Sequence, residues 1–116
     1  MTRYWHGGGR NPGEWLLPST ETGNERSGPG DGWVYVTPNR ALAVNYSAST
    51  DSPWVYEVQP LGELEQDPES HLEPGQSMRC RKARILRRER PSANEVQRAR
   101  SSLLVADRML SLRDLL

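Results

Sequence analysis

Short apolar and aromatic runs, separated by turn-forming residues, divide this chain into a series of short elements. Five runs have the aromatic and β-branched content that favours strands, and they lie at residues 3–6, 14–18, 33–37, 54–59 and 78–86. Gly and Pro are frequent between the runs and limit each one to a few residues. The pattern therefore predicts five short strands joined by turns.

The run at residues 54–59 alternates most clearly. Side chains point to alternate faces of an extended chain, so Trp54, Tyr56 and Val58 share one face. Val55 and Glu57 share the other face. This run predicts a strand with two different environments.

Two segments carry the start signals of helices. Thr37 followed by Pro38 is typical of an N-cap and a first helical residue, and it predicts a helix that runs to about Ala48. Ser92 and Glu95 form a capping box at the start of a second helix. Apolar positions in this second helix recur at steps of three and four, which predicts one buried stripe: Val96, Ala99, Leu103, Ala106 and Leu110.

Two further stretches read as loops. Residues 19–32 have almost no apolar side chains and predict an exposed, mobile loop, whereas residues 60–75 are acidic and contain Pro and Gly. We find no repeat and no linker between the strands and the helices. The organisation predicts one α+β domain over residues 1–116, with a C-terminal helix in residues 90–116 packed on it.

The composition narrows the class of protein. No run approaches the roughly 18 apolar residues needed to cross a bilayer, and the first residues do not form a basic and apolar leader. A single cysteine, Cys80, cannot form an internal disulfide, so we expect it to be a buried apolar residue in a reducing compartment. These features predict a cytoplasmic protein with no membrane contact.

Opposite charges are concentrated in the two halves of the chain. Residues 1–74 contain 4 Arg and 11 Asp or Glu, whereas residues 75–116 contain 10 Arg, 1 Lys and 4 Asp or Glu. Mutual neutralisation of two packed halves is the simpler interpretation. The alternative is a non-catalytic module that binds nucleic acid through a basic strand in residues 79–90, with these cations: Arg79, Arg81, Lys82, Arg84, Arg87, Arg88 and Arg90.

Three motifs follow one another in the chain: His6-Gly7, then Tyr35, then an acidic loop with Asp67-Pro68. Their order and spacing resemble those of the rifamycin-modifying family of NAD-dependent ADP-ribosyltransferases, and the resemblance implies cleavage of the nicotinamide–ribose bond of NAD. This reaction needs contacts to the ribose and carboxamide, an aromatic face for nicotinamide, and negative charge beside the ribose as it becomes positive. His6 can hydrogen-bond a ribose hydroxyl, and Gly7 allows a ligand close to the backbone. Tyr35, just before the first predicted helix, supplies an aromatic face. The acidic loop supplies Glu65 and Asp67 as alternative carboxylates.

The resemblance to this family extends over roughly residues 3–90. The resemblance implies a small ADP-ribosyltransferase-like fold, with twisted antiparallel strands around an NAD cleft and NAD as co-substrate. It also implies catalytic roles for His6, Tyr35 and Asp67. Asp67 is preferred because the family's catalytic aspartate directly precedes a proline, as it does here.

The resemblance further implies which residues bind NAD: His6, Gly7, Gly8, Tyr35, Ser77 and Arg79. The last two fall where the family has a Ser-aromatic-Arg strand. The chain departs from the family at three positions. Gly8 replaces a threonine, Gln66 replaces an acidic residue, and Met78 replaces an aromatic residue.

The acceptor of ADP-ribose stays open among three classes: a rifamycin-like small molecule, a nucleobase or nucleic-acid end, and a protein side chain. The first would make the protein an antibiotic-resistance transferase. Transfer to water would make it an NAD glycohydrolase of the toxin type instead. No metal is expected, because His6, His71 and Cys80 are too few and too irregularly spaced for a zinc site.

Overall fold

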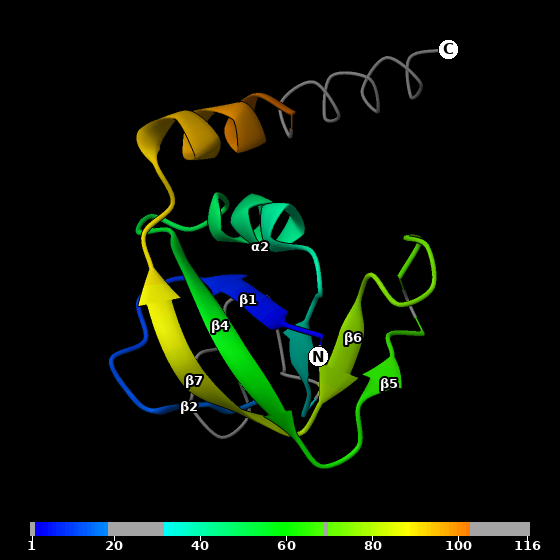
Figure 1. The fold of residues 1–116 in the computed structure, drawn as a ribbon. Helices are drawn as coiled ribbons and strands as arrows, with labels where there is room; N and C mark the ends of the chain where they lie inside the picture. The colour runs from blue at the N-terminus through cyan, green and yellow to red at the C-terminus, as the bar shows by residue number, and fades with distance from the viewer. Residues whose placement is uncertain (1, 19–31, 69, 103–116) are drawn as a thin grey trace.

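The computed structural model describes residues 2–18, 32–68 and 70–102, and it confirms the predicted α+β class (Figure 1). Two antiparallel sheets form the body of the molecule. The four-stranded sheet has the order β1-β4-β7-β2, with bounds Tyr4–Gly8, Trp54–Leu61, Lys82–Glu89 and Trp15–Leu16. The three-stranded sheet has the order β3-β6-β5, with bounds Val34–Val36, Met78–Cys80 and Glu65–Gln66.

One backbone bridge joins the two sheets. Trp5 on β1 and Thr37, just beyond β3, exchange hydrogen bonds of 2.7 and 2.9 Å between their backbone groups. Since β1 and β3 are each the edge strand of their own sheet, the bridge connects the two edges. The residues around His6 are thereby attached to the start of the three-stranded sheet.

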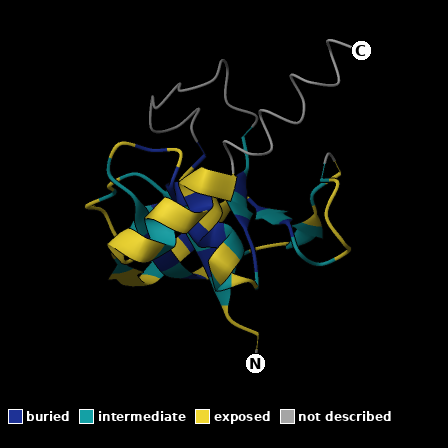
Figure 2. Cartoon of the chain, turned by 90° about the horizontal axis from the view of Figure 1, so that it is seen from above, coloured by how far each residue is buried: buried dark blue, intermediate teal, exposed yellow. Residues whose placement is uncertain are grey.

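The core has two parts, one on each face of the four-stranded sheet. The first part packs that sheet against the three-stranded sheet and consists of Leu16, Val34, Val36, Tyr56, Val58, Cys80 and Ala83. The second part packs it against the helices and consists of Trp5, Ala43, Val44, Ala48, Val55 and Ala99. Tyr56 and Val55 are neighbours on β4 but belong to different parts, which confirms the predicted alternation. Seen from above, the helices present exposed positions outward and cover buried ones (Figure 2).

The first described helix, α2 (Arg40–Ser47), begins later than the sequence predicts. Asn39 is its N-cap, and its side chain accepts a hydrogen bond of 3.0 Å from the backbone nitrogen of Ala41. Thr37 is not the N-cap because the bridge to β1 holds its backbone in the sheet. Its hydroxyl instead accepts a hydrogen bond from the backbone nitrogen of Asn39. The prediction of Thr37 as N-cap and Pro38 as first helical residue is therefore wrong.

The strand predicted at residues 78–86 is two strands. β6 ends at Cys80 and β7 begins at Lys82, and the two strands belong to different sheets. Basic and apolar residues alternate in the same way on both sides of the break, so periodicity could not locate it. The predicted loop at residues 60–75 contains β5. Of the loop predicted at residues 19–32, all but Gly32 lies outside the described residues.

The C-terminal helix begins as predicted. The backbone nitrogen of Glu95 donates to Oγ of Ser92, and the backbone nitrogen of Ser92 donates to Oε1 of Glu95, both at 3.1 Å. Helical residues are described over 93–102. Ala99 is buried and Val96 packs against the same cluster, which confirms the start of the apolar stripe. The rest of the predicted stripe lies outside the described residues: Leu103, Ala106 and Leu110.

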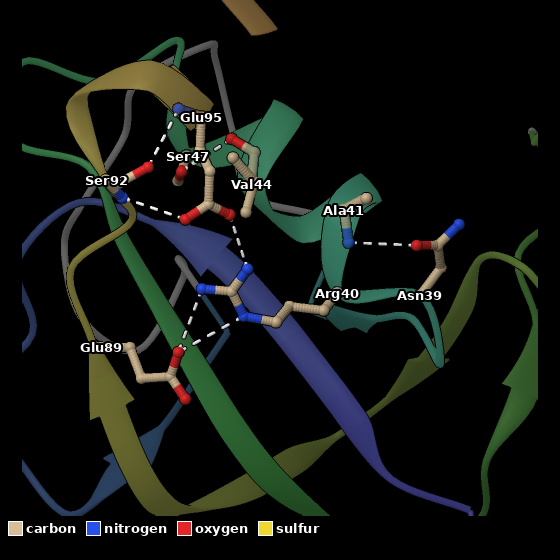
Figure 3. A network of polar contacts seen from close by, with 8 residues as sticks. All are labelled: Asn39, Arg40, Ala41, Val44, Ser47, Glu89, Ser92 and Glu95. Carbon is tan, nitrogen blue, oxygen red and sulfur yellow. Dashed lines mark hydrogen bonds and ion pairs between the residues drawn. The ribbon is translucent and has the colours of Figure 1, made fainter. Parts of the chain in front are cut away.

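Two arginines attach this helix to its neighbours. Arg40 on α2 donates to Glu95 at 2.6 Å and to Glu89 on β7 at 3.1 Å, so one guanidinium joins three elements (Figure 3). Arg100 donates to two backbone carbonyl groups just past the end of α2, at 3.1 and 3.3 Å. The helix at 93–102 is thus bonded to α2 near both of its ends.

Candidate active site

His6 lies on β1, against the strand that carries Tyr35. Its Nδ1 is 2.7 Å from the backbone carbonyl oxygen of Tyr35. A carbonyl oxygen only accepts, so Nδ1 donates, and in the neutral ring Nε2 is then an acceptor. Burial lowers the pKa of His6 from 6.5 and outweighs the opposite effect of the hydrogen bond to Tyr35. At pH 7 the ring is therefore mainly neutral, with Nε2 able to accept a hydrogen bond from a hydroxyl group.

Gly7 and Gly8 leave out side chains on opposite faces of this strand. A Cβ at Gly7 would overlap the carbonyl group of Ala43 on α2 and lie 3.0 Å from the backbone nitrogen of Ser47. A Cβ at Gly8 would lie 3.2 Å from Nε2 of His6. Glycine at position 7 is thus explained by the close packing of α2 on β1. Glycine at position 8 is explained by the limited space beside the imidazole of His6.

The backbone of Gly7 faces the edge of β1 that lies away from β4. Trp5 uses its backbone groups to bond Thr37, on the side of β1 away from β4. In an antiparallel pair these groups alternate in direction from one residue to the next. The N–H and C=O of Gly7 therefore point the same way as those of Trp5, outward from the sheet edge.

Tyr56 completes this corner, although the sequence indicated only that it shares one face of a strand with Trp54 and Val58. It is paired with His6 across β1 and β4, and the two ring centroids are 6.3 Å apart. Its hydroxyl donates to the carbonyl oxygen of Gly9 at 2.6 Å and accepts from the backbone nitrogen of Asn11 at 2.7 Å. Burial raises the pKa of Tyr56, so its hydroxyl stays protonated. Tyr56 therefore fixes the turn that follows His6.

The other predicted residues share the face of the three-stranded sheet that points away from the core. Tyr35, Arg79 and Glu65 are register partners and form one row across the strands. Ser77 and Asp67 lie two residues along the chain from Arg79 and Glu65, respectively, and face each other in the next row. The backbone nitrogen of Asp67 donates to the carbonyl oxygen of Ser77 at 3.0 Å, and Oγ of Ser77 donates to Oδ2 of Asp67 at 3.3 Å. Core residues occupy the alternate positions, so these side chains lie on the opposite face.

Arg79 is the centre of the first row. Its Nε donates to Oε1 of Glu65 at 2.6 Å, and the two side chains form an ion pair. Desolvation acts to lower the pKa of Arg79 and is the largest single effect, but hydrogen bonds and charge attraction from Glu65 and Tyr35 raise it overall. Arg79 therefore connects Glu65 with Tyr35. The two candidate acids differ in their partners, because Glu65 is engaged by Arg79 and Asp67 is held by Ser77.

The basic segment 79–90 does not form one basic face. Its cations are divided between two sheets, and most of them contact groups of the same molecule. Arg88 donates to the carbonyl oxygens of Asn11 and Gly13 at 3.0 and 2.8 Å. All four tryptophans lie against a cation, 3.6–5.9 Å from the ring centroid: Trp5 with Arg40, Trp15 with Lys82, Trp33 with Arg79 and Arg81, and Trp54 with Arg90. The basic residues thus have structural uses, which weakens the interpretation as a nucleic-acid module.

Two open grooves lie along the C-terminal helix. One of about 750 Å³ is bordered by the residues before β4 and after β7, and one of about 620 Å³ follows the helix itself. Neither groove is lined by His6, Tyr35 or Asp67. The predicted NAD cleft between the strands therefore does not coincide with either of them.

Comparison with protein-family models and with curated proteins finds no match for this chain.

Within residues 2–18, 32–68 and 70–102, no group of three His, Cys, Asp or Glu side chains is arranged to hold a metal ion. His71 is exposed and Cys80 is buried, as expected. In the same part of the chain, no helix is long and apolar enough to cross a membrane.

Proposed function

We propose that this protein is a mono-ADP-ribosyltransferase that cleaves NAD and transfers ADP-ribose to an acceptor. The observation that carries the proposal is the 2.7 Å hydrogen bond between His6 and the carbonyl oxygen of Tyr35. It joins two elements that are 29 residues apart in the chain, and it leaves Nε2 as an acceptor. This pairing supports the interpretation of the His-Gly turn and the tyrosine strand as parts of one site.

The proposed roles follow from the chemistry of each group. Nε2 of His6 accepts a hydrogen bond from a hydroxyl of the nicotinamide ribose. The outward N–H and C=O of Gly7 match the acceptor and the donor of the carboxamide. The ring of Tyr35 packs against nicotinamide. The carboxylate of Asp67 stabilises the positive charge that develops on the ribose.

The reaction needs no proton on the leaving group. The bond between C1′ of the ribose and the nicotinamide nitrogen breaks, and its electron pair leaves with nicotinamide, which is already cationic in NAD. A lone pair of the acceptor then forms the new bond at C1′, and the acceptor loses its proton to solvent. The side chains therefore act by position and charge rather than by proton transfer.

The position of Asp67 directly before Pro68 favours it over Glu65, because the catalytic aspartate of the resembled family also precedes a proline. Glu65 is neutralised by its ion pair with Arg79, so it contributes less negative charge to the ribose. Asp67 accepts a hydrogen bond of 3.3 Å from Oγ of Ser77, which helps to fix the direction of its carboxylate. The resemblance makes a rifamycin-like small molecule the first acceptor to test, with nucleic-acid ends and protein side chains after it.

The test measures nicotinamide release and adduct formation together. Purified protein is incubated with NAD and each class of acceptor, nicotinamide is quantified, and acceptors are examined by mass spectrometry. Asp67→Asn is expected to slow nicotinamide release by about 100-fold, the cost of losing one preorganised electrostatic partner. Glu65→Gln should slow it less, and Glu63→Gln, an exposed acid of the same loop, should behave as the parent.

Three results would decide between the alternatives. Absence of both nicotinamide release and saturable NAD binding in the parent would remove the proposal. Free ADP-ribose without any adduct would assign the glycohydrolase activity instead. A larger effect of Glu65→Gln than of Asp67→Asn would exchange the roles of the two acids.

A further inference from the structure

Two guanidinium groups lie against one tryptophan beside the row that contains Tyr35. Cζ of Arg79 is 4.0 Å and Cζ of Arg81 is 3.6 Å from the ring centroid of Trp33. Arg81 also donates from Nη1 to the carbonyl oxygen of Gly32 at 2.9 Å. Both cations are thus held in place by the indole and by a second contact.

Among the described residues, the charge balance of this cluster leaves a positive excess. Glu65 neutralises Arg79, whose side chain is 21% exposed, whereas Arg81 is exposed and its second contact is a neutral carbonyl oxygen. When a guanidinium stacks on an indole, its flat face contacts the ring. Its N–H groups lie in the plane of the guanidinium and therefore point sideways, parallel to the ring. A guanidinium has five N–H donors, and the bond to Gly32 uses one of those on Arg81.

Phosphate is the ligand that this arrangement fits. The planar fork of arginine matches two oxygens of a phosphate group, and an arginine that is already held in place loses less conformational entropy on binding. Trp33 is two residues before Tyr35 on the same chain, so the two side chains lie about 7 Å apart along the extended backbone. A phosphate bound at Arg81 would therefore be close to a nucleotide whose nicotinamide packs against Tyr35.

We propose that Trp33, Arg79 and Arg81 form a phosphate-binding subsite next to the proposed NAD site. The phosphate belongs to NAD itself, as its diphosphate, or to a phosphorylated acceptor such as a nucleic-acid end. The two sources share the same chemistry and are separated by experiment. The subsite can bind phosphate whether or not the protein turns over NAD. Its assignment to NAD or to a phosphorylated acceptor rests on the proposed function.

Binding of inorganic pyrophosphate tests the subsite by itself. Isothermal titration calorimetry is done on the parent and on Arg81→Ala, with Arg84→Ala, an exposed arginine of β7, as the matched control. Arg81→Ala should weaken binding at least tenfold or so, the usual effect of losing a charge-assisted hydrogen bond. Arg84→Ala should leave it unchanged. Equal affinities for the two variants, or no saturable binding by the parent, would overturn the proposal.

A second variant separates the stacked geometry from the charge alone. Trp33→Leu keeps both arginines but removes the indole, and circular dichroism checks that it is folded. It should also weaken pyrophosphate binding, because the guanidinium groups are no longer held. If folded Trp33→Leu binds as tightly as the parent, Trp33 does not form part of the subsite and the proposal is wrong.

Kinetics of Arg81→Ala then identify the source of the phosphate. If the subsite takes the diphosphate of NAD, KM for NAD rises and pyrophosphate competes with NAD, while cleavage of nicotinamide riboside, which has no phosphate, is unaffected. If it takes the acceptor's phosphate, KM for NAD stays constant and transfer to a 5′-phosphorylated oligonucleotide falls relative to a 5′-hydroxyl one. Loss of pyrophosphate binding with neither kinetic effect would show that the subsite serves neither source and would overturn its place in the proposed site.

Discussion

A single absent side chain decides how closely α2 approaches β1. At Gly7, the space that a Cβ would fill is occupied by the backbone of Ala43 and Ser47. Both groups are backbone atoms of a regular helix, so neither can move aside as the tip of a flexible side chain can. The same residue presents its N–H and C=O to the edge of the strand away from β4, in a different direction. Gly7 therefore serves both the packing of the helix and the proposed ligand contact.

Replacement of Gly7 by alanine should lower the free energy of unfolding by about 1–3 kcal/mol or more, because the added methyl group overpacks the interface with α2. Denaturant titration measures the change. Gly13→Ala is the matched control, since a Cβ there would lie 3.4 Å from the nearest atom. Equal stabilities of the two variants would mean that α2 does not pack as closely on β1 as described.

The lowered pKa of His6 links stability to pH. The unfolded chain binds a proton near pH 6.5 and the folded protein only at lower pH, so the unfolded state gains protons first as the pH falls. The free energy of unfolding should therefore decrease below pH 6.5, by at most about 1.4 kcal/mol per pH unit. His6→Asn keeps a donor for Tyr35 but does not titrate, and it should flatten this slope in denaturant titrations between pH 7.5 and 5.5. An unchanged slope in His6→Asn would contradict this link between His6 and stability.

Individual residues were predictable where their surroundings are local. The capping box of Ser92 and Glu95 involves neighbours in the chain, and it forms as the sequence indicates. The role of Tyr56 depends on a turn 45 or more residues away, which no local pattern records. Thr37 looked like an N-cap because its neighbours suit one. A long-range bridge to Trp5 decided otherwise.

At the scale of elements, the helix at 93–102 stabilises α2, which in turn covers β1. The contact between the two helices combines the apolar residues Val96 and Ala99 with polar bonds toward each end. The polar bond at the start of the helix is shared, because Arg40 also pairs with Glu89 on β7. Loss of that arginine would leave two carboxylates close together.

Arg40→Ala should therefore lower the free energy of unfolding by about 1–2 kcal/mol, more than a lone surface ion pair contributes. The side chains of Arg40, Glu89 and Glu95 are about one-third exposed, so solvent screening limits the effect. A double-mutant cycle with Glu95→Gln should give a coupling of about 0.5–1 kcal/mol. Arg98→Ala, an exposed arginine of the same helix, should change stability little. Additive effects of Arg40→Ala and Glu95→Gln would contradict the network in Figure 3.

The elements themselves were largely predictable, but their ends and partners were not. Hydrophobic periodicity found β4 and the helix at 93–102, because each has a buried and an exposed face. The first helix was found from its start signal, which lies a few residues before its true start. Periodicity could not locate the break at Arg81. The same alternation of basic and apolar residues is expected from one long strand and from two consecutive short ones. Periodicity also missed β5, whose two residues are too few to show a period and depend on β6 for their hydrogen bonds.

At the scale of the whole molecule, the candidate site is assembled from both halves of the chain. The order of motifs indicated His6, Tyr35 and Asp67, and the structure brings His6 against Tyr35 and aligns Tyr35 with the strand next to Asp67. The sequence did not indicate that Arg81 would stack on Trp33, since this contact follows from register between β3 and β6. Pairing between strands distant in the chain is the information that local patterns lack.

That pairing has a consequence for how the protein is made. β1, β2 and β3 find their ladder partners in β4, β7 and β6, all of which are translated later. In a nascent chain, the first three strands therefore have no ladder partners until the later strands leave the ribosome. Such late, long-range closure is slow compared with the folding of local hairpins. We expect His6 and Tyr35 to meet only after most of the chain has emerged, so the nascent polypeptide would have no assembled site during most of its synthesis.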